Sequence, residues 1–344
     1  MPCVLNRLVA LTLAAFAALG QAPAQAQGPA AVVGAPTTPS LDDQARNLTR
    51  WGDLESLERL YNEVKQPGRY TPQGNALVAN FHHGTDRALG TPRDTGEAFM
   101  VEVDAMTLDW TQKRPASPLV HWLRAQALVN RAWEVRGSGF SKEVAPQAWA
   151  AFTRHLESAV QHVANMSAVS LQDSTAYVEL INAGRGLGWD LSRQEQLVVA
   201  GRQRNPDDLS LWHALLTSSL PKWQGNPVLV DRLIRRAADQ HKERGDEIYA
   251  RLYFSAADED FSHTVFRDTA ADWPRIRKGL RDSISRWPAK AVFWNRLAYF
   301  ACLKEDRETL TEALDKLQDK PDLEQWGTNA RRVFETCQKL SRQG

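Results

Sequence analysis

The sequence predicts an all-α protein made of helical hairpins that stack side by side into an α-solenoid. Two observations support this fold class. Aromatic residues recur at intervals typical of a helical hairpin, and sustained alternation of β-branched residues between turn signals is missing. The chain has 344 residues, of which 43% are hydrophobic and 24% charged, so it is long enough to bury a sizeable core. We therefore expect a right-handed stack of antiparallel helix pairs.

Five segments carry the repeat signal. Each opens with an aromatic residue that small or apolar residues follow within one helical turn: Trp122, Tyr177, Trp212, Tyr249 and Trp294. These residues are 55, 35, 37 and 45 positions apart. A tetratricopeptide unit is about 34 residues long, with an early aromatic residue and a proline near its end. The clearest unit spans 291–322 and closes at Pro321. We classify the fold as degenerate tetratricopeptide-like hairpins.

Residues 1–26 have the features of a secretory signal peptide. Arg7 precedes an apolar run from Leu8 to Gly20, and Ala24-Gln25-Ala26 fits a signal-peptidase site. The apolar run is shorter than the roughly 20 residues that a membrane-spanning helix needs. We expect cleavage after Ala26, no membrane-spanning segment in the mature chain, and a periplasmic or secreted location.

The rest of the chain divides into three predicted regions. Residues 27–40 are rich in proline, glycine and alanine and are expected to form a disordered linker. Residues 41–115 are expected to form a helical capping region, in which one helix runs from Ser40 to about Val64. Residues 116–344 are expected to form the α-helical repeat domain.

The charge balance bears on the class of partner. The sequence has 42 Lys and Arg against 41 Asp and Glu, and removal of residues 1–26 takes away Arg7, which leaves a net charge of zero. A nucleic-acid partner would require a basic face. We therefore expect a protein or peptide partner and no nucleic acid.

Two cysteines, Cys302 and Cys337, remain after cleavage. In an oxidising compartment they could form one disulfide, which would contribute about 3–4 kcal/mol in the loop-entropy description. Two buried thiols are the alternative, because cysteine also packs well in an apolar core.

Several strings, most of which contain tryptophan, lie mostly between the predicted helices. They are Ala132-Trp133 with Arg136-Gly137-Ser138-Gly139-Phe140, Gly188-Trp189, Leu220-Pro221-Lys222-Trp223 with Gly225, Asp272-Trp273-Pro274, and Asn295 to Cys302 with Asp306-Arg307. Together they resemble an uncharacterised bacterial family of Trp-rich, tetratricopeptide-like helical-repeat proteins, over residues 45–310. That resemblance implies the fold and, by analogy, a scaffold role, with no assigned activity.

Four residues in these loops are the candidate ligand- or partner-binding residues: Arg136, Asp190, Lys222 and Trp223. Lys222 and Trp223 place a cation next to a large aromatic ring, a pairing suited to a peptide, a glycan or a carboxylate. The structural alternative is that Trp223 folds back to seal its own loop. For the loop around Arg136, the alternative is a helix connector with capping glycines.

We assign no catalytic residue, metal ligand or cofactor. The sequence contains no G-x-S-x-G, H-E-x-x-H or C-x-x-C motif. His155 and His162 would be separated by about 10.5 Å along one helix, too far to share one ion. The string Gly184-x-Gly186-x-Gly188 lacks the spacing of a dinucleotide loop and is expected at a helix end.

The sequence therefore favours an exported protein- or peptide-binding scaffold. The alternative is a cell-envelope hydrolase built on a helical scaffold, which would need a concave pocket holding two carboxylates, or an acid and a histidine, within reach of one substrate. A third hypothesis, a factor that acts outside the cell, rests on the signal peptide alone.

Overall fold

The computed structural model describes residues 39–90, 96–137, 139, 141–223, 225–318 and 320–342. These residues form helices packed against their neighbours, so the predicted all-α solenoid is confirmed. Within this described part, the only β pairing is one isolated bridge between Tyr70 and Ala76. The expected signal peptide and most of the expected linker lie outside the described residues. No helix within the described ranges is both long and apolar enough to cross a membrane.

Four helices make up the N-terminal region: α1 (Leu41–Arg50), α2 (Leu54–Val64), α3 (Leu77–Leu89) and α4 (Gly96–Lys113). The single helix expected from Ser40 to Val64 is wrong, because the chain breaks between α1 and α2. Gly52 has a φ of 70°, which a helix cannot accommodate, and the side chain of Asp53 then caps α2 by accepting from the Ser56 amide. Ser40 caps α1 as expected, by accepting from the amide of Asp43.

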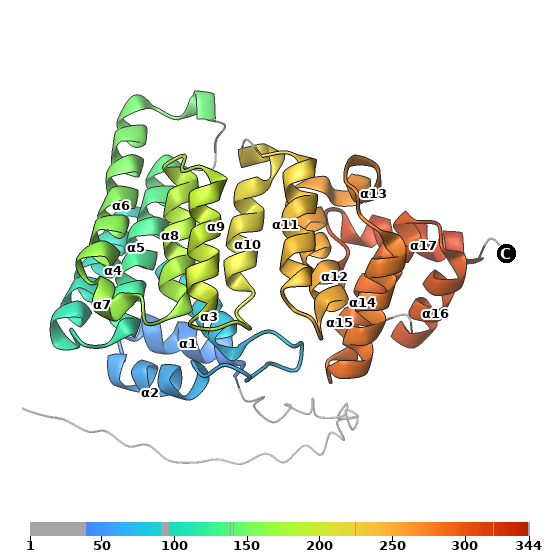
Figure 1. The fold of residues 1–344 in the computed structure, drawn as a ribbon, viewed down its shortest axis with the longest axis horizontal. Coiled ribbons are helices and arrows are strands. Elements are labelled where there is room, and N and C mark those ends of the chain that lie inside the picture. The colour runs from blue at the N-terminus through green and yellow to red at the C-terminus, as the bar shows by residue number, and fades with distance from the viewer. Residues whose placement is uncertain are drawn as a thin grey trace, which may run out of the picture. The chain divides into compact units, whose positions relative to one another are not determined.

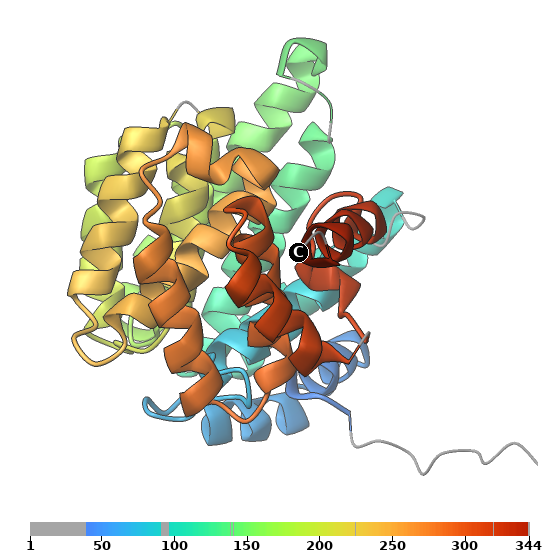
Figure 2. The same cartoon turned by 90° about the vertical axis from the view of Figure 1, so that its right-hand side faces the viewer.

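The following helices stand side by side in a row (Figure 1). They are α5 (Pro118–Arg136), α6 (Pro146–Asn165), α7 (Ser167–Ser170), α8 (Ser174–Gly186), α9 (Leu191–Arg202), α10 (Ser210–Ser219), α11 (Pro227–Asp239) and α12 (Gly245–Ala256). The row continues with α13 (Val265–Asp268), α14 (Trp273–Arg286), α15 (Lys290–Leu303), α16 (Arg307–Leu317) and α17 (Ala330–Arg342). Neighbours in the chain pack on one another, and Figure 2 shows the same stack from its C-terminal side.

Short helical turns connect several of these helices. Four are 3-10 turns, η1 (Ser141–Glu143), η2 (Pro221–Trp223), η4 (Ser262–Thr264) and η5 (Leu323–Gln325), and the π-helical turn η3 (Ala257–Phe261) extends α12. Two of them, η2 and η3, meet beside the cleft described below.

The repeated aromatic residues anchor the core. Trp122, Tyr177, Trp212 and Tyr249 are all buried within α5, α8, α10 and α12. Trp294 is only half-buried, and its neighbour Phe293 is the aromatic side chain that α15 buries completely. The core is continuous from α8 to α17, because each hairpin covers the apolar face of the next one.

A buried polar network joins the N-terminal region to the row of helices. Nε2 of His82 in α3 lies 2.6 Å from Oε1 of Glu179 in α8, and both side chains are largely buried. The hydroxyl of Tyr61 in α2 donates to Oδ2 of Asp173 over 2.5 Å. Asp173 in turn caps α8 by accepting from the Thr175 amide, so α2 is fixed relative to the start of α8.

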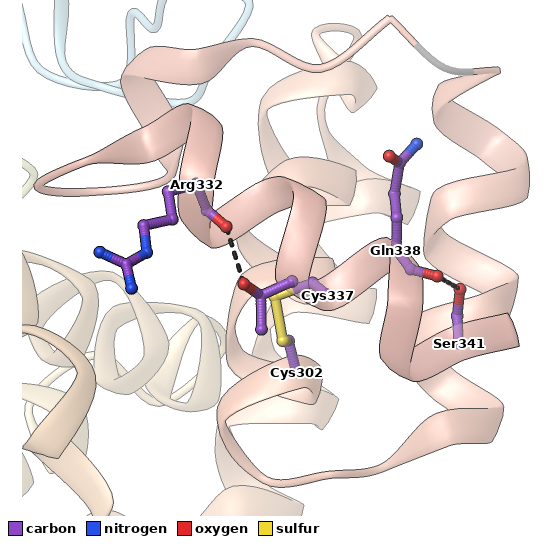
Figure 3. Close-up of a disulfide and its surroundings, with 6 residues drawn as sticks. Cys302, Arg332, Cys337, Gln338 and Ser341 are labelled. Carbon is purple, nitrogen blue, oxygen red and sulfur yellow. Dashed lines mark hydrogen bonds between the residues drawn. A yellow bond between two sulfur atoms is a disulfide. The ribbon is translucent and has the colours of Figure 1, made fainter. Parts of the chain in front are cut away.

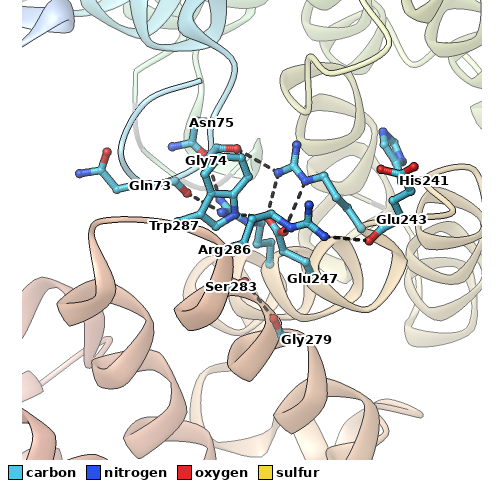
Figure 4. Close-up of polar contacts among 12 residues, drawn as sticks. Gln73, Gly74, Asn75, His241, Glu243, Glu247, Gly279, Ser283, Arg286 and Trp287 are labelled. Atoms are coloured by element: carbon cyan, nitrogen blue, oxygen red, sulfur yellow. Dashed lines mark hydrogen bonds and ion pairs between the residues drawn. The ribbon is translucent and has the colours of Figure 1, made fainter. Parts of the chain in front are cut away.

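The loop between α2 and α3 forms a strap, residues 65–76, that reaches α12 and α14 (Figure 4). Arg244 donates to the carbonyl of Gly74, and Arg251 donates to Oδ1 of Asn75 over 2.9 Å. Gly74 has a φ of 76°, and a Cβ there would come within 2.3 Å of the Trp287 ring. The strap therefore needs glycine at this position.

Glu247 lies at the centre of the contacts that hold the strap. It is 1% exposed, and its carboxylate pairs with Arg244 at 2.7 Å and Arg251 at 2.9 Å. The indole N–H of Trp287 also donates to it over 2.9 Å. Burial alone would raise the pKa of Glu247, but the hydrogen bond from Arg244 and the charges of Arg251 and Arg244 outweigh it and lower that pKa.

Cys302 in α15 and Cys337 in α17 are joined by a disulfide, so the alternative of two free thiols is wrong (Figure 3). Their Cα atoms are 5.5 Å apart, and the bond closes a separation of 35 residues. Phe334, also in α17, packs edge-on against the buried Trp326 at 4.9 Å. The last helix is therefore attached both covalently and by apolar packing.

We predict that the Cys302→Ser/Cys337→Ser double variant loses stability by about 4 kcal/mol, because the disulfide restricts the unfolded chain. Urea unfolding of the two proteins without a reducing agent measures the loss. Addition of a reducing agent should destabilise the parent protein and leave the variant unchanged. Equal stability of parent and variant would contradict the prediction.

Glu247→Gln should destabilise the protein by about 3 kcal/mol at pH 7, because Arg251 stays buried without its counter-charge. The lowered pKa of Glu247 means that its contribution is fully present above the ordinary value of 4.5 and is lost as the pH falls through the folded-state value. The difference between parent and variant should therefore shrink below about pH 4.5 in urea unfolding curves.

The matched control is Glu55→Gln, which removes a solvent-exposed ion pair with Arg59. Exposed pairs of this kind contribute about 0–1 kcal/mol. Similar losses for the two variants, or a Glu247→Gln loss that does not change with pH, would show that the buried pairs do not hold the strap.

Candidate functional site

A cleft of about 1600 Å³ opens where three helix connections meet. Its walls come from the end of α5, the start of α6, the turn between α8 and α9, and the connection between α10 and α11. All four residues predicted from the sequence line this cleft: Arg136, Asp190, Lys222 and Trp223. The fold thus brings together candidates that lie far apart in the chain, while their role in binding remains a prediction.

Tryptophan and arginine side chains contact one another along the cleft in a group that we call the tryptophan–arginine ladder, made of Trp149, Arg136, Trp133, Arg185 and Trp223. The Arg136 guanidinium lies 5.4 Å from the Trp149 ring and 5.8 Å from the Trp133 ring. The Arg185 guanidinium lies 5.6 Å from Trp133 and 5.4 Å from Trp223. The rings of Trp133 and Trp223 also meet edge-to-face at 5.2 Å. Cation–π contacts therefore connect four separate elements.

Glycines at the end of α8 allow its neighbours to approach. A Cβ on Gly186 would lie 2.4 Å from Leu156 of α6, and one on Gly184 would lie 2.5 Å from the Trp189 ring. The amide of Trp189 donates to the carbonyl of Gly184 over 2.9 Å. α8 ends at Gly186, as expected from the sequence. These glycines position α6 and Trp189 as two walls of the cleft.

The loop with Lys222 and Trp223 is held on both sides. Nζ of Lys222 donates to the carbonyl of Glu259 over 2.8 Å and lies 3.6 Å from its carboxylate. Gly225 is packed so tightly that a Cβ would lie 1.8 Å from the carbonyl of Ser219. Trp223 is half-buried and its indole N–H is buried without a partner. The side chain packs on Trp133 of α5 and Arg185 of α8 and lines the cleft, while its role in binding stays a prediction.

Arg136 and Asp190 have local structural partners. Nη1 of Arg136 donates to the carbonyls of Gly137 and Gly139 over 2.8 and 3.2 Å, which holds the loop after α5. Asp190 caps α9 by accepting from the Arg193 amide over 2.8 Å. The hydrogen bond from Ser192 lowers the pKa of Asp190, so this carboxylate is ionised at neutral pH. Ser138 and Phe140 of the same loop string lie outside the described residues.

Arg185 is the cleft residue that sequence reasoning missed. It is half-buried in α8, and its one hydrogen bond within the described structure runs from Nη1 to Oδ1 of Asn182 over 3.3 Å. Nε is buried without a partner, and no described carboxylate pairs with the guanidinium. Burial lowers the pKa of Arg185, against the opposing charges of Glu259 and Glu179. The sequence feature that could have identified Arg185 is its position between Gly184 and Gly186 at the end of a helix.

Carboxylates line three cavities of the described structure. In the smallest of the three, of about 350 Å³, Asp246 and Asp282 both pair with Lys278, at 3.0 and 2.7 Å. Glu134 and Asp190 both line the cleft, but Asp190 is engaged as a helix cap. A second cavity of about 900 Å³ is lined by Glu157 and His162. Because they are five residues apart on α6, their side chains point about 140° apart. Burial and the charge of His121 lower the pKa of His162 to about 4.

We predict that Arg185→Met raises the free energy of unfolding by about 1 kcal/mol. A buried charge without a counter-ion is unfavourable, and methionine fills a similar volume beside the two indoles. Thermal and urea unfolding measure the gain. A clear loss of stability would mean that the cation–π contacts of Arg185 outweigh the cost of its burial.

Comparison with known proteins finds one family model that matches part of this chain. No curated protein and no solved structure matches the chain. A family model matches residues 43–189, which run from α1 to Trp189 and include Trp133, Arg136, Trp149 and Arg185 of the ladder. The expected resemblance to an uncharacterised family is confirmed over these residues: they match the family described as a domain of unknown function, DUF4034.

Proposed function

We propose that this protein is an exported binding scaffold that takes a peptide or protein segment in the tryptophan-lined cleft. The observation that carries the proposal is the convergence of four loop residues, chosen from the sequence alone, on one cleft of about 1600 Å³. Its volume exceeds the roughly 300–1,000 Å³ of typical small-molecule pockets and suits an extended segment.

The lining of the cleft also supports this proposal. Tryptophan and arginine are the side chains that dominate the binding energy of protein interfaces, since they combine a large apolar area with polar groups. Trp133, Trp149, Trp189 and Trp223 all line the cleft, together with Arg136 and Arg185. Several of these side chains are already held by contacts with one another, so little conformational entropy is lost when a ligand binds.

Two features support export. The N-terminal 26 residues have the pattern of a signal peptide, and the Cys302–Cys337 disulfide is typical of proteins from oxidising compartments. The proposed compartment is therefore the periplasm or the extracellular space, and a segment of an envelope or secreted protein would be available there as partner.

We expect the purified full-length protein to bind members of a random hexapeptide pool and to change its tryptophan fluorescence on binding. The Lys222→Ala/Trp223→Ala double variant should bind about tenfold or more weakly, because it loses an aromatic wall of the cleft. Titration by fluorescence and by calorimetry measures both affinities, and thermal unfolding checks that the variant is folded.

The matched control is Trp51→Ala, since Trp51 is 86% exposed and does not line the cleft. This variant should bind as tightly as the parent. Absence of peptide binding by the parent, or equal binding by the folded double variant, would refute the proposed function.

A further inference from the structure

We propose that the Arg185 guanidinium is the specificity determinant of the cleft and binds a carboxylate of the peptide. This inference rests on the proposed function and names the ligand chemistry. The carboxylate is either the peptide C-terminus or an Asp or Glu side chain, because both present the same planar pair of oxygens.

The argument starts from the unused edge of the guanidinium. An arginine recognises a carboxylate best through two parallel N–H groups on one edge. Nη1 of Arg185 is engaged with Asn182, while Nη2 and Nε have no partner within the described structure. The edge of Arg185 that carries Nη2 and Nε therefore has two donors without an acceptor in the described structure, and a ligand could supply that acceptor.

The other cations that line the cleft are engaged. Lys222 donates to the carbonyl of Glu259 and lies 3.6 Å from its carboxylate. Arg136 donates to two loop carbonyls. Elsewhere in the described structure, Arg124 and Arg131 pair with Asp104. Arg185 differs from Arg136 because its Nε is buried without a partner. It differs from Arg124 and Arg131 because it lines the cleft without an anionic partner.

Two further polar atoms of the cleft lining lack partners. The indole N–H of Trp223 is a buried donor, and Oε1 of Gln194 is a buried acceptor. Both residues line the cleft. A peptide offers carboxylate and carbonyl acceptors together with N–H donors, so one segment could satisfy both kinds of atom. Because Nε and the indole N–H are covered, a bound carboxylate would shift the neighbouring indoles.

The stacking of Arg185 favours a carboxylate over water. The guanidinium lies 5.6 Å from the Trp133 ring and 5.4 Å from the Trp223 ring, and these two rings contact each other, so the guanidinium packs beside the pair of indoles. A charge-assisted hydrogen bond in such a partly desolvated place is stronger than one at an exposed surface. We therefore expect a peptide without any carboxylate to bind much more weakly than one that has it.

The test uses the full-length protein and four hexapeptide pools. One pool has free C-termini and no Asp or Glu, one is amidated and contains Asp and Glu, one has both kinds of carboxylate, and one has neither. Each pool is titrated against the parent and Arg185→Gln, with tryptophan fluorescence as readout. The parent should bind the pool without carboxylates at least tenfold more weakly than the best pool. Arg185→Gln should lose this discrimination.

Comparison of the first two pools identifies the source of the carboxylate, and either source supports the proposal. Arg202→Gln is the matched control. Arg202 also stacks on a tryptophan, 5.7 Å from the Trp212 ring, and also has a buried Nε without a partner, but it does not line the cleft. This variant should discriminate among the pools as the parent does.

Three results would overturn the proposal. If the parent binds all four pools equally and the Lys222/Trp223 double variant binds none, the cleft binds peptides without reading a carboxylate. If folded Arg185→Gln keeps the discrimination, another residue recognises the carboxylate and the assignment to Arg185 is wrong. If no pool binds and oligogalacturonate binds through Arg185, the ligand is an acidic glycan and the peptide-binding function fails as well.

Discussion

The structure depends on the burial of one hairpin's apolar face against the next hairpin. A pair of helices in this chain cannot cover its own aromatic residues, so Trp122, Tyr177, Trp212 and Tyr249 become buried only when their neighbours stack. The resulting core is continuous from α8 to α17. Stacking also fixes where the helix ends lie, and this determines which loops can meet at a common cleft.

A stack of this kind has two ends that need protection from fraying. At the C-terminal end, the Cys302–Cys337 disulfide and the packing of Phe334 on Trp326 hold α17. At the other end, the strap crosses from the N-terminal helices to α12 and α14, where buried Glu247 organises Arg244 and Arg251. The attachment of α17 and the contacts of the strap both join segments distant in the sequence, so they restrict how far the stack can open.

The cleft combines tight packing with unused polar groups. Gly184, Gly186 and Gly225 let helices and loops approach more closely than a residue with a side chain would. Within that frame the tryptophan–arginine ladder holds Arg185 without an anion, although isolated charges are costly to bury. Such an arrangement lowers stability where it stands, which is typical of positions that are kept for binding.

The sequence by itself determined the fold class and indicated the loops that line the cleft, because helical periodicity and loop composition are local properties. Local patterns could not show that Gly52 splits the first helix, that Phe293 replaces Trp294 in the core, or that Arg185 belongs to the site. Those outcomes depend on backbone dihedral angles and on neighbours from other helices. The tertiary structure alone decided that Cys302 meets Cys337 and that Arg136, Asp190, Lys222 and Trp223 share one cleft, because only packing sets distances between segments far apart in the chain.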